Sequence, residues 1–259
     1  MGLPLARACI DNHYVVKGST TTPDKLKILE ASSILPFCIN CHPDIQGQHL
    51  QDFFNSQTLF LNIPFKRSLI NPWFYKEQIA SVVDYVRRSS VEWIIFASST
   101  SVYPDSLKVA REDSIFEPDN ERAQVLKDVE KMLLHDSGKK VTILRFAGLI
   151  GAKRQPGRFL SGQVKILDGH SPVNLVHQDD CIAIILKILD KGIHNIVLNV
   201  CADEHPSKKD FYQEAARRLG VPLPGFADGD MRGGKIVDNA LVKKMLGYQF
   251  KYPDPLKAI

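Results

Sequence analysis

Four consecutive hydroxyl side chains at the end of an apolar run are the residues of this sequence best placed to do chemistry. Residues 98–101 are Ser, Ser, Thr and Ser, and they follow the apolar run of residues 93–97. A continuous apolar run of this length is typical of a buried strand. Hydroxyl groups both donate and accept hydrogen bonds, so they can hold a polar ligand or polarise a substrate oxygen. The cluster therefore indicates a site at the end of a strand rather than a turn.

The composition of the 259-residue chain excludes several classes of protein. Hydrophobic residues make up 44% and charged residues 24%, which is ordinary for a globular protein. The net charge of +4 is weak, and basic pairs such as Arg87-Arg88 and Lys139-Lys140 fall at predicted helix ends, so we expect no nucleic-acid partner. No apolar stretch approaches the ~20 residues of a membrane helix and no signal peptide is recognisable, so we expect a cytoplasmic protein without a membrane partner.

The five cysteines are scattered, but two of them belong to a known string. Residues 38–42 read Cys-Ile-Asn-Cys-His, which matches the C-x-x-C-H string of c-type haem attachment. The surrounding residues also have the pattern of a short strand, and haem attachment requires an exported protein. We therefore interpret the cysteines as thiols in a reducing compartment and predict no metal site.

Apolar runs alternate with helical patterns along most of the chain. Strands are predicted at residues 14–18, 35–40, 58–63, 93–97, 141–146 and 196–200. Their continuous apolarity favours parallel strands that are covered on both faces. Helices are predicted at residues 71–88, 120–135, 180–189 and 208–219. Repeated strand–helix–strand units predict an α/β fold with a right-handed, doubly wound parallel sheet.

The character of the sequence changes after about residue 152. Glycines punctuate a loop-rich region, and the segment from Pro222 onward is rich in proline and glycine. This profile predicts that residues 153–259 form a small lobe on the substrate side, interleaved with the sheet of residues 1–152.

Three strand-end motifs carry a family resemblance. They are Ser98-Ser99-Thr100-Ser101-Val102-Tyr103, the segment Leu144–Gly151, and Val176-His177-Gln178-Asp179-Asp180. Together with Leu246-Gly247-Tyr248 and Tyr252-Pro253, they resemble the extended, epimerase/dehydratase-like branch of the short-chain dehydrogenase/reductase superfamily. The resemblance covers nearly the whole chain. It implies a Rossmann-like fold in which residues 1–152 bind a dinucleotide.

The acid/base pair of that superfamily is absent from this sequence. The family carries a Tyr-x-x-x-Lys pair on the helix after the hydroxyl strand, because a nearby cation lowers the tyrosine pKa. None of the seven tyrosines here has a lysine four residues later. If Glu130 occupies the family's glutamate position, Arg122 and Leu126 stand where the tyrosine and lysine are expected. The chain therefore resembles the atypical members, which keep the fold without the pair.

Three residues are the candidates for catalysis, and the resemblance implies the role of the first, Ser99. Ser99, aided by Thr100, would polarise the substrate oxygen. Arg122 is always charged, so it can stabilise negative charge but cannot usefully donate a proton. The structural alternative is an ion pair of Arg122 with Asp119 or Glu121.

The predicted cofactor contacts come from four segments. They are Gly2, the hydroxyl segment Ser19, Thr20 and Thr21, the strand end Asn62-Ile63-Pro64, and Ser98. An acidic residue after the second family strand would favour NAD, but none occurs before Asp24. Hydroxyls near Lys17 or Lys25 tolerate a 2′-phosphate, so NADP is favoured over NAD. An ordinary Ser/Thr turn is the structural alternative.

Arg145, Arg158 and His177 are the candidate substrate-binding residues. The two arginines suit an anionic small molecule, although either can equally form a structural ion pair. The segment of His177 more often orients a loop and caps the next helix in the resembled family. Helices 71–88 and 120–135 are candidates for that family's four-helix dimer interface, so a homodimer is among the expected partners.

The sequence thus predicts an NAD(P)-binding, epimerase/dehydratase-like oxidoreductase without the standard Tyr-x-x-x-Lys pair. The alternative is a non-catalytic dinucleotide-binding sensor or scaffold protein. Gly2 is interpreted as the third glycine of a G-x-G-x-x-G motif, with an apolar first strand and two glycines expected upstream of Met1. Without them, we expect impaired cofactor binding, because those glycines let the backbone approach the pyrophosphate.

Overall fold

The computed structural model describes residues 1–66, 68–151, 154–227 and 233–259. The chain divides into two compact units made of interleaved segments. Unit 1 comprises Met1–Ser98, Asn120–Ile143 and Gly192–Ile196. Unit 2 comprises Ser99–Asp119, Leu144–Lys191 and Val197–Ile259. The functional domains predicted at residues 1–152 and 153–259 stay a prediction.

Unit 1 contains helices and two groups of strands. Its elements in chain order are α1 (Gly2–Asp11), β1 (Lys17–Thr20), the 3₁₀ turn η1 (Pro23–Lys25), α2 (Leu26–Glu30), β2 (Leu35–Cys41), β3 (Ile45–Gly47), α3 (Leu50–Phe54), β4 (Thr58–Leu61), α4 (Trp73–Arg87), β5 (Trp93–Ser99), α5 (Glu121–Asp136) and the first residues of β7 (Lys140–Phe146). One sheet has the order β1-β2-β3, with β1 and β2 parallel and β3 antiparallel to β2. The second sheet has the order β10-β7-β5-β4, in which β4 and β5 are parallel and β10 (Ile196–Val200) has only its first residue in unit 1.

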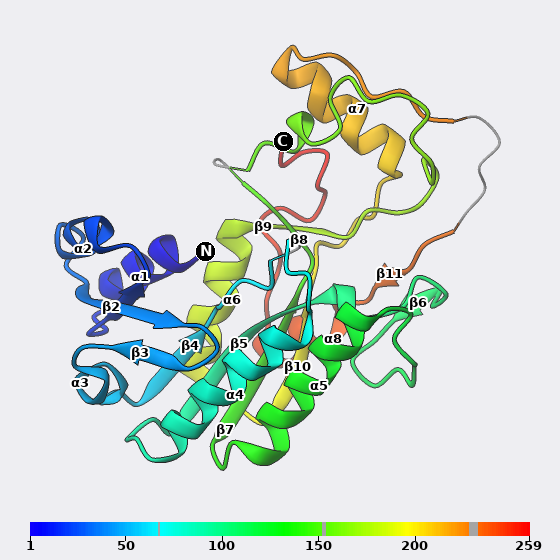
Figure 1. Ribbon diagram of the computed structural model, residues 1–259. Coiled ribbons are helices and arrows are strands. Elements are labelled where there is room, and N and C mark those ends of the chain that lie inside the picture. Colours follow the sequence, from blue (N-terminus) through cyan, green and yellow to red (C-terminus); the bar gives the residue numbers. More distant parts are fainter. Residues whose placement is uncertain (67, 152–153, 228–232) are drawn as a thin grey trace. The chain divides into compact units, whose positions relative to one another are not determined.

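Helices α4 and α5 lie side by side in unit 1 (Figure 1). In α4 the buried residues are Tyr75, Ile79, Val82, Val83 and Val86, which follow helical spacing and form one apolar face. The Asn120 side chain accepts a hydrogen bond from the N–H of Ala123 at 2.9 Å and caps the first turn of α5. These local signals explain why both helices are observed where the sequence predicts them.

Unit 2 carries shorter strands and long connections. Its elements are η2 (Thr100–Val102), β6 (Val109–Ala110), the end of β7, β8 (Gly148–Ile150), η3 (Pro156–Arg158), β9 (Leu175–His177), α6 (Gln178–Lys191), β10 (Ile196–Val200), α7 (Lys208–Leu219), β11 (Ile236–Val237) and α8 (Ala240–Leu246). Parallel pairs join β8 to β9 and β6 to β11. The predicted N-cap Ser207 accepts from the Asp210 N–H at 3.0 Å, and Gly220 ends α7 with φ = 65°.

The predicted α/β fold class is confirmed, but the first predicted strand is misplaced. The strand expected at residues 14–18 begins at Lys17 and runs to Thr20. Val15 is 86% exposed, so its apolarity does not mark a core position. The strand predicted before Met1 stays a prediction. No helix in the described part of the chain is long and apolar enough to span a membrane.

Candidate functional site

The hydroxyl cluster at the end of β5 divides between two environments. Ser98 is buried and donates a hydrogen bond to the Glu130 carboxylate, which is also buried. Both residues belong to unit 1. The Ser98 hydroxyl therefore already donates its proton to Glu130 of α5. The predicted contact of Ser98 with a cofactor stays a prediction.

Ser99 and Thr100 begin unit 2 and have a different setting. The Ser99 Oγ accepts a hydrogen bond from the Ser101 N–H at 3.1 Å, which caps the 3₁₀ turn η2. Across residues 1–66, 68–151, 154–227 and 233–259, no acceptor takes the Ser99 hydroxyl proton. Ser99 is half-buried and Thr100 is buried. Ser99 is thus a positioned hydroxyl whose proton is free to be donated to a ligand oxygen.

The segment after β4 is held by aromatic and cationic side chains of α4 and α5. The Tyr75 hydroxyl donates to the Ile63 carbonyl at 3.1 Å. The Phe65 ring stacks on the Tyr75 ring, with centroids 4.3 Å apart and an interplanar angle of 7°. Burial raises the pKa of the Tyr75 hydroxyl, so this hydroxyl acts as a neutral donor. The predicted cofactor residues Asn62-Ile63-Pro64 therefore lie in a segment with fixed geometry.

Arg122 completes this arrangement, which we call the Phe65 clamp (Phe65, Tyr75 and Arg122). The Arg122 Nη2 donates to the carbonyls of Phe65 and Lys66, both at 3.1 Å. Its guanidinium carbon lies 3.9 Å from the Phe65 ring centroid, which is a cation–π contact. The structural alternative of an ion pair with Asp119 or Glu121 is not what the described contacts show. The predicted stabilisation of substrate charge by Arg122 stays a prediction.

The remaining predicted cofactor residues lie near the N-terminal part of unit 1. Ser19 and Thr21 are exposed, and the Thr20 Oγ1 accepts from the Thr22 N–H at 3.2 Å in a short turn. The Lys17 ammonium donates to the backbone carbonyls of Asp52 and Asn55, so it is not free for a phosphate.

Gly2 begins α1. A Cβ added at Gly2 would meet nothing within 4 Å, so packing in this structure does not require a glycine there.

Arg145 is the centre of a buried polar network in unit 2, which we call the Tyr103 network (Tyr103, Arg145, Asn199 and Glu112). The Arg145 Nη1 donates to the Tyr103 hydroxyl at 2.6 Å, and that hydroxyl donates to the Asn199 Oδ1 at 2.9 Å. The Asn199 N–H donates to the Glu112 carboxylate at 2.7 Å. Burial raises the pKa of both Tyr103 and Glu112, and the charge of Arg145 opposes each shift.

The Tyr103 network was not predicted, although the sequence holds one signal for it. Asn199 interrupts the apolar strand of residues 196–200, and a buried amide in such a strand needs hydrogen-bond partners. Its Nδ2 finds them in the carbonyls of Ala110 and Asp238, at 3.3 and 3.1 Å. The predicted substrate-binding role of Arg145 stays a prediction.

His177 lies at the end of β9, close in sequence to Asp180, whose hydrogen bonds hold the C-terminal segment. Its Nδ1 accepts from the Asp179 N–H at 3.2 Å, and its ring lies 3.9 Å from the Tyr252 ring. The buried Asp180 accepts from the Tyr248 hydroxyl at 2.6 Å and from the Lys251 N–H at 2.7 Å. These contacts agree with the interpretation that this segment orients a loop.

Arg158 is exposed on η3 and lines a hollow of about 400 Å³ together with Arg154, Gln155 and Phe159. Within the residues that the structure describes, no salt bridge joins either arginine to a carboxylate. The two guanidinium groups suit an anion, and the half-exposed Phe159 ring adds an apolar wall.

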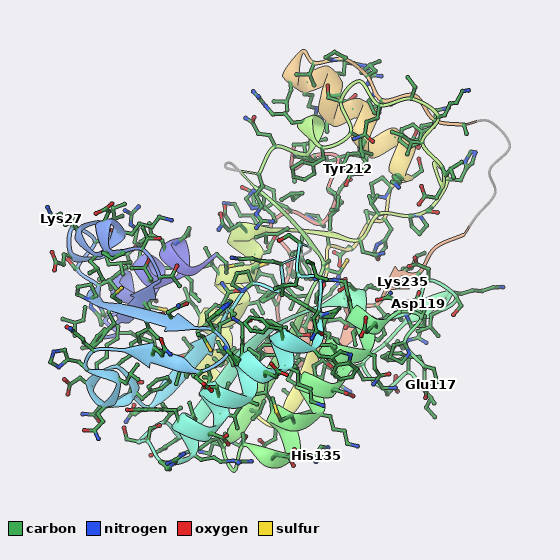
Figure 2. The ribbon with its side chains drawn as sticks, in the orientation of Figure 1. Lys27, Glu117, Asp119, His135, Tyr212 and Lys235 are labelled. Carbon is green, nitrogen blue, oxygen red and sulfur yellow. The ribbon has the colours of Figure 1, made fainter. Side chains whose placement is uncertain are left out.

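A salt bridge and a hydrogen bond also hold the segment that follows η2. Lys235 forms a salt bridge with Asp105 at 2.6 Å, and the Asp105 N–H donates to Asp119 at 3.3 Å (Lys235 and Asp119 are labelled in Figure 2). In the described part of unit 2, no hydrogen bond or ion pair joins Ser99 to Arg145, Arg158 or His177. Among the described residues of unit 2, Ser99 is therefore not bonded to any of the three predicted substrate-binding residues.

No family model matches the chain. Protein YeeZ of Escherichia coli (strain K12) is 35% identical over 261 residues, which cover 99% of this chain and 94% of that protein. A solved structure of a functionally unknown conserved protein from Silicibacter pomeroyi is 23% identical, with a TM-score of 0.79 over 99% of this chain and 92% of that one.

A solved UDP-glucuronic acid 4-epimerase from Bacillus cereus, in complex with NAD, is 18% identical, with a TM-score of 0.75 over 99% of this chain and 93% of that one. The resemblance read from the strand-end motifs is thus confirmed at the level of the fold. The chain belongs to the family of Protein YeeZ, and it shares its Rossmann-like fold with the solved UDP-glucuronic acid 4-epimerase.

Proposed function

We propose that this chain is an NAD(P)-dependent, epimerase/dehydratase-like oxidoreductase in which Ser99, aided by Thr100, polarises the substrate oxygen. The Ser99 hydroxyl carries the proposal. It lies at the carboxyl end of β5, its oxygen is fixed by the Ser101 N–H, and no described residue takes its proton. Ligands of open α/β sheets bind at the carboxyl ends of the strands, which supports this assignment.

The residues proposed to hold the dinucleotide come from unit 1. The Asn62-Ile63-Pro64 segment fits this role because the Phe65 clamp keeps it rigid, and a rigid segment loses little entropy on binding. Ser19 and Thr21 present exposed hydroxyls at the end of β1. When bound, the nicotinamide group supplies hydride transfer.

The preference for NADP over NAD is retained as part of the proposal, but it now rests on Lys25 alone. Lys17 is occupied by the carbonyls of Asp52 and Asn55, whereas Lys25 is exposed and has no ion pair in the part of the chain that the structure describes. An exposed ammonium near the β1 hydroxyls suits a 2′-phosphate.

Arg122 is proposed to serve in two ways. Its Nη2 positions the Phe65 segment, while its Nε and Nη1 have no acceptor among the described residues and remain able to stabilise an anion. The substrate is proposed to be anionic, because Arg154 and Arg158 line one hollow without a salt bridge in the described chain. A sugar nucleotide, the substrate class of the Bacillus cereus epimerase, meets this requirement.

Cofactor binding and turnover should be measured separately on the full chain. NADPH and NADH binding are followed by fluorescence titration, and hydride transfer is followed by absorbance with a panel of sugar nucleotides and carbonyl compounds. We expect Ser99→Ala to abolish turnover of any accepted substrate while leaving NADPH affinity within twofold. Ser101→Ala is the matched control, since the exposed Ser101 contributes its backbone N–H and not its hydroxyl.

The alternative function is a dinucleotide-binding sensor or scaffold protein without turnover. One observation favours it: the two positions of α5 that match the missing pair carry Arg122, which is bonded to backbone carbonyls, and the buried Leu126. Saturable NADPH binding without hydride transfer to any panel compound would support this alternative. Turnover that survives Ser99→Ala would remove Ser99 from the site.

A further inference from the structure

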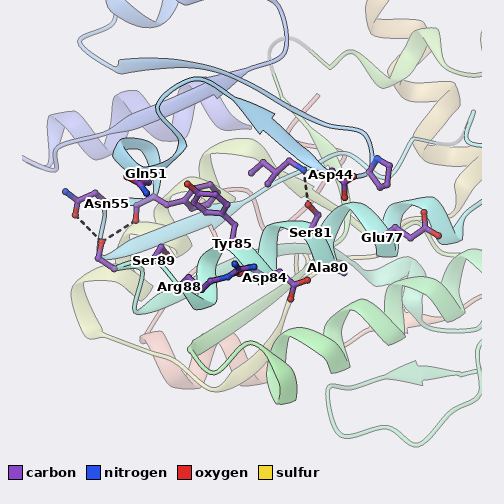
Figure 3. Close-up of a pocket in the computed structure, with 14 residues that line it drawn as sticks. Asp44, Gln51, Asn55, Glu77, Ala80, Ser81, Asp84, Tyr85, Arg88 and Ser89 are labelled. Carbon is purple, nitrogen blue, oxygen red and sulfur yellow. Dashed lines mark hydrogen bonds between the residues drawn. The ribbon is translucent and has the colours of Figure 1, made fainter.

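A surface groove of about 850 Å³ in unit 1 lies outside every residue assigned above. It runs between α4 and the wall formed by the β2–β3 connection and α3 (Figure 3). Its lining comes from the β2–β3 connection, α3, one face of α4 and the residues that follow α4. The volume is within the range of ligand sites, roughly 300–1,000 Å³.

The length of the groove is set by one face of α4. Glu77, Ser81, Asp84 and Arg88 all line it, and their spacing of three and four residues places them on the same side of the helix. A rise of 1.5 Å per residue makes the distance from residue 77 to residue 88 about 16 Å along the axis. An extended peptide rises about 3.3 Å per residue, so about five residues cover this length.

One end of the groove is acidic. Asp44 and Glu77 are both exposed, and no hydrogen bond or salt bridge engages either carboxylate in the part of the chain that the structure describes. The nearby charge of Asp44 adds to burial in raising the pKa of the Cys41 thiol to about 11. This end therefore presents two unpaired negative charges.

The other end carries a positive charge. The Nε of Arg88 donates to the Asp84 backbone carbonyl at 3.3 Å, and no carboxylate of the described residues forms a salt bridge with its guanidinium. The Asp84 carboxylate is already paired with Arg87 at 3.0 Å. Asn55 and Ser90, joined by a 3.1 Å hydrogen bond, stand at this end with exposed polar groups. The groove is thus negative at one end and positive at the other.

The middle of the groove is aromatic. The half-buried Tyr85 ring rests on the buried Phe54 ring, with centroids 4.8 Å apart. Along the axis of α4, Tyr85 lies between Glu77 and the C-cap residue Arg88, and all three are labelled in Figure 3. Its hydroxyl has no hydrogen-bond partner within the described ranges, so it remains able to bond to a peptide backbone. The facing wall is fixed, because the Ile45 N–H donates to the Ser81 Oγ at 2.8 Å.

We propose that this groove binds an extended peptide segment of about five residues. The segment carries a basic side chain at the Asp44–Glu77 end, an aromatic side chain over Tyr85 and a carboxylate at Arg88. The charge pattern selects the two end residues, and the fixed wall lowers the entropy cost of binding. An open groove with exposed residues along its whole length suits a segment that passes through it better than an enclosed small molecule.

The test uses three fluorescein-labelled pentapeptides with blocked ends: Lys-Thr-Phe-Thr-Glu, Lys-Thr-Phe-Thr-Lys and Glu-Thr-Phe-Thr-Glu. Their affinities for the full chain are compared by fluorescence anisotropy at low salt. We expect the mixed-charge peptide to bind at least about fivefold more tightly than the other two, because each exposed charge pair contributes up to about 1 kcal/mol. Replacing its phenylalanine by alanine should weaken binding further.

Two exposed variants should switch this preference. Arg88→Glu makes both ends acidic and should favour Lys-Thr-Phe-Thr-Lys by about fivefold. The double variant Asp44→Lys/Glu77→Lys makes the acidic end basic and should favour Glu-Thr-Phe-Thr-Glu by about fivefold. Lys27→Glu and Glu30→Lys on α2 are the matched controls, since both residues are exposed and do not line the groove (Lys27 is labelled in Figure 2). If the groove variants rank the peptides as the unmodified chain does, or if no peptide binds, the proposal is overturned.

Discussion

The Phe65 clamp of unit 1 and the Tyr103 network of unit 2 both contain an arginine packed against an aromatic ring, but the two contacts serve different purposes. In each, an arginine lies over an aromatic ring, with the guanidinium 3.9 Å from Phe65 and 4.8 Å from Tyr103. Arg122 is half-buried and bonds backbone carbonyls, whereas Arg145 is only 7% exposed and bonds a buried hydroxyl.

The difference between the two regions lies in what surrounds the charge. If Arg122 is removed, water can donate hydrogen bonds to the carbonyls that Arg122 binds, because these carbonyls belong to a surface segment. Arg145 is enclosed with the Glu112 carboxylate nearby, so its removal leaves a half-buried acid without the opposing positive charge. The same contact therefore positions a loop in unit 1 and stabilises a core in unit 2.

The largest predicted effect is the loss of the buried arginine. Arg145→Met should lower the free energy of unfolding by about 3–5 kcal/mol, because it leaves the buried partners of Arg145 without their positively charged donor. Arg122→Met should cost only about 1–2 kcal/mol, because it removes two hydrogen bonds near solvent. Urea unfolding followed by circular dichroism measures both.

Arg7→Met serves as the exposed control for this pair, and it should change stability by less than about 0.5 kcal/mol. Equal losses for Arg145→Met and Arg122→Met would show that burial does not distinguish the two regions.

Matched removals of a tyrosine hydroxyl sharpen the comparison. Tyr103→Phe should cost about 1.5–3 kcal/mol, because the hydroxyl bonds a charged group and a buried amide. Tyr75→Phe removes one bond to a carbonyl and should cost about 1 kcal/mol. Thermal and urea unfolding measure the difference, with Tyr14→Phe at an exposed position as control. A larger loss at Tyr75 would reverse our ranking of the two regions.

The smallest predicted effect concerns pH. Burial raises the pKa of Glu112 above its ordinary value of 4.5, so the native state binds more protons than the unfolded state in this range. The contribution of Glu112 to stability is therefore full below pH 4.5 and falls as the pH rises through the raised pKa.

Glu112→Gln removes this titration. The stability of the variant relative to the unmodified chain should therefore increase between pH 4.5 and 7, as measured by urea unfolding at several pH values. Parallel stability curves for the two proteins would contradict the assignment.

Much of the fold could be predicted because its signals are local. The apolar periodicity and caps of α4, α5 and α7 lie within each helix, and β10 was predicted at its observed bounds. The strand near residue 14 was misplaced because Val15 is apolar but exposed, and composition does not distinguish exposed from buried apolar residues.

The candidate site was predictable only in part. The hydroxyls at the end of β5 and the missing Tyr-x-x-x-Lys pair can be read from residue types and spacing alone. The sequence alone does not show that the Ser98 hydroxyl donates to Glu130 while the Ser99 hydroxyl has no acceptor among the described residues. Consecutive strand residues point to opposite faces and therefore meet different neighbours.

By itself, the sequence determined the α/β class, the positions of the long helices and the absence of the superfamily's acid/base pair. Only the tertiary structure decided which arginine stabilises a core and which positions a loop. Arg122 meets Phe65 across 57 residues, and Tyr103 meets Asn199 across 96. Such contacts depend on how distant elements pack together. Packing determines how deeply each charge is buried, and burial determines how much the charge contributes to stability.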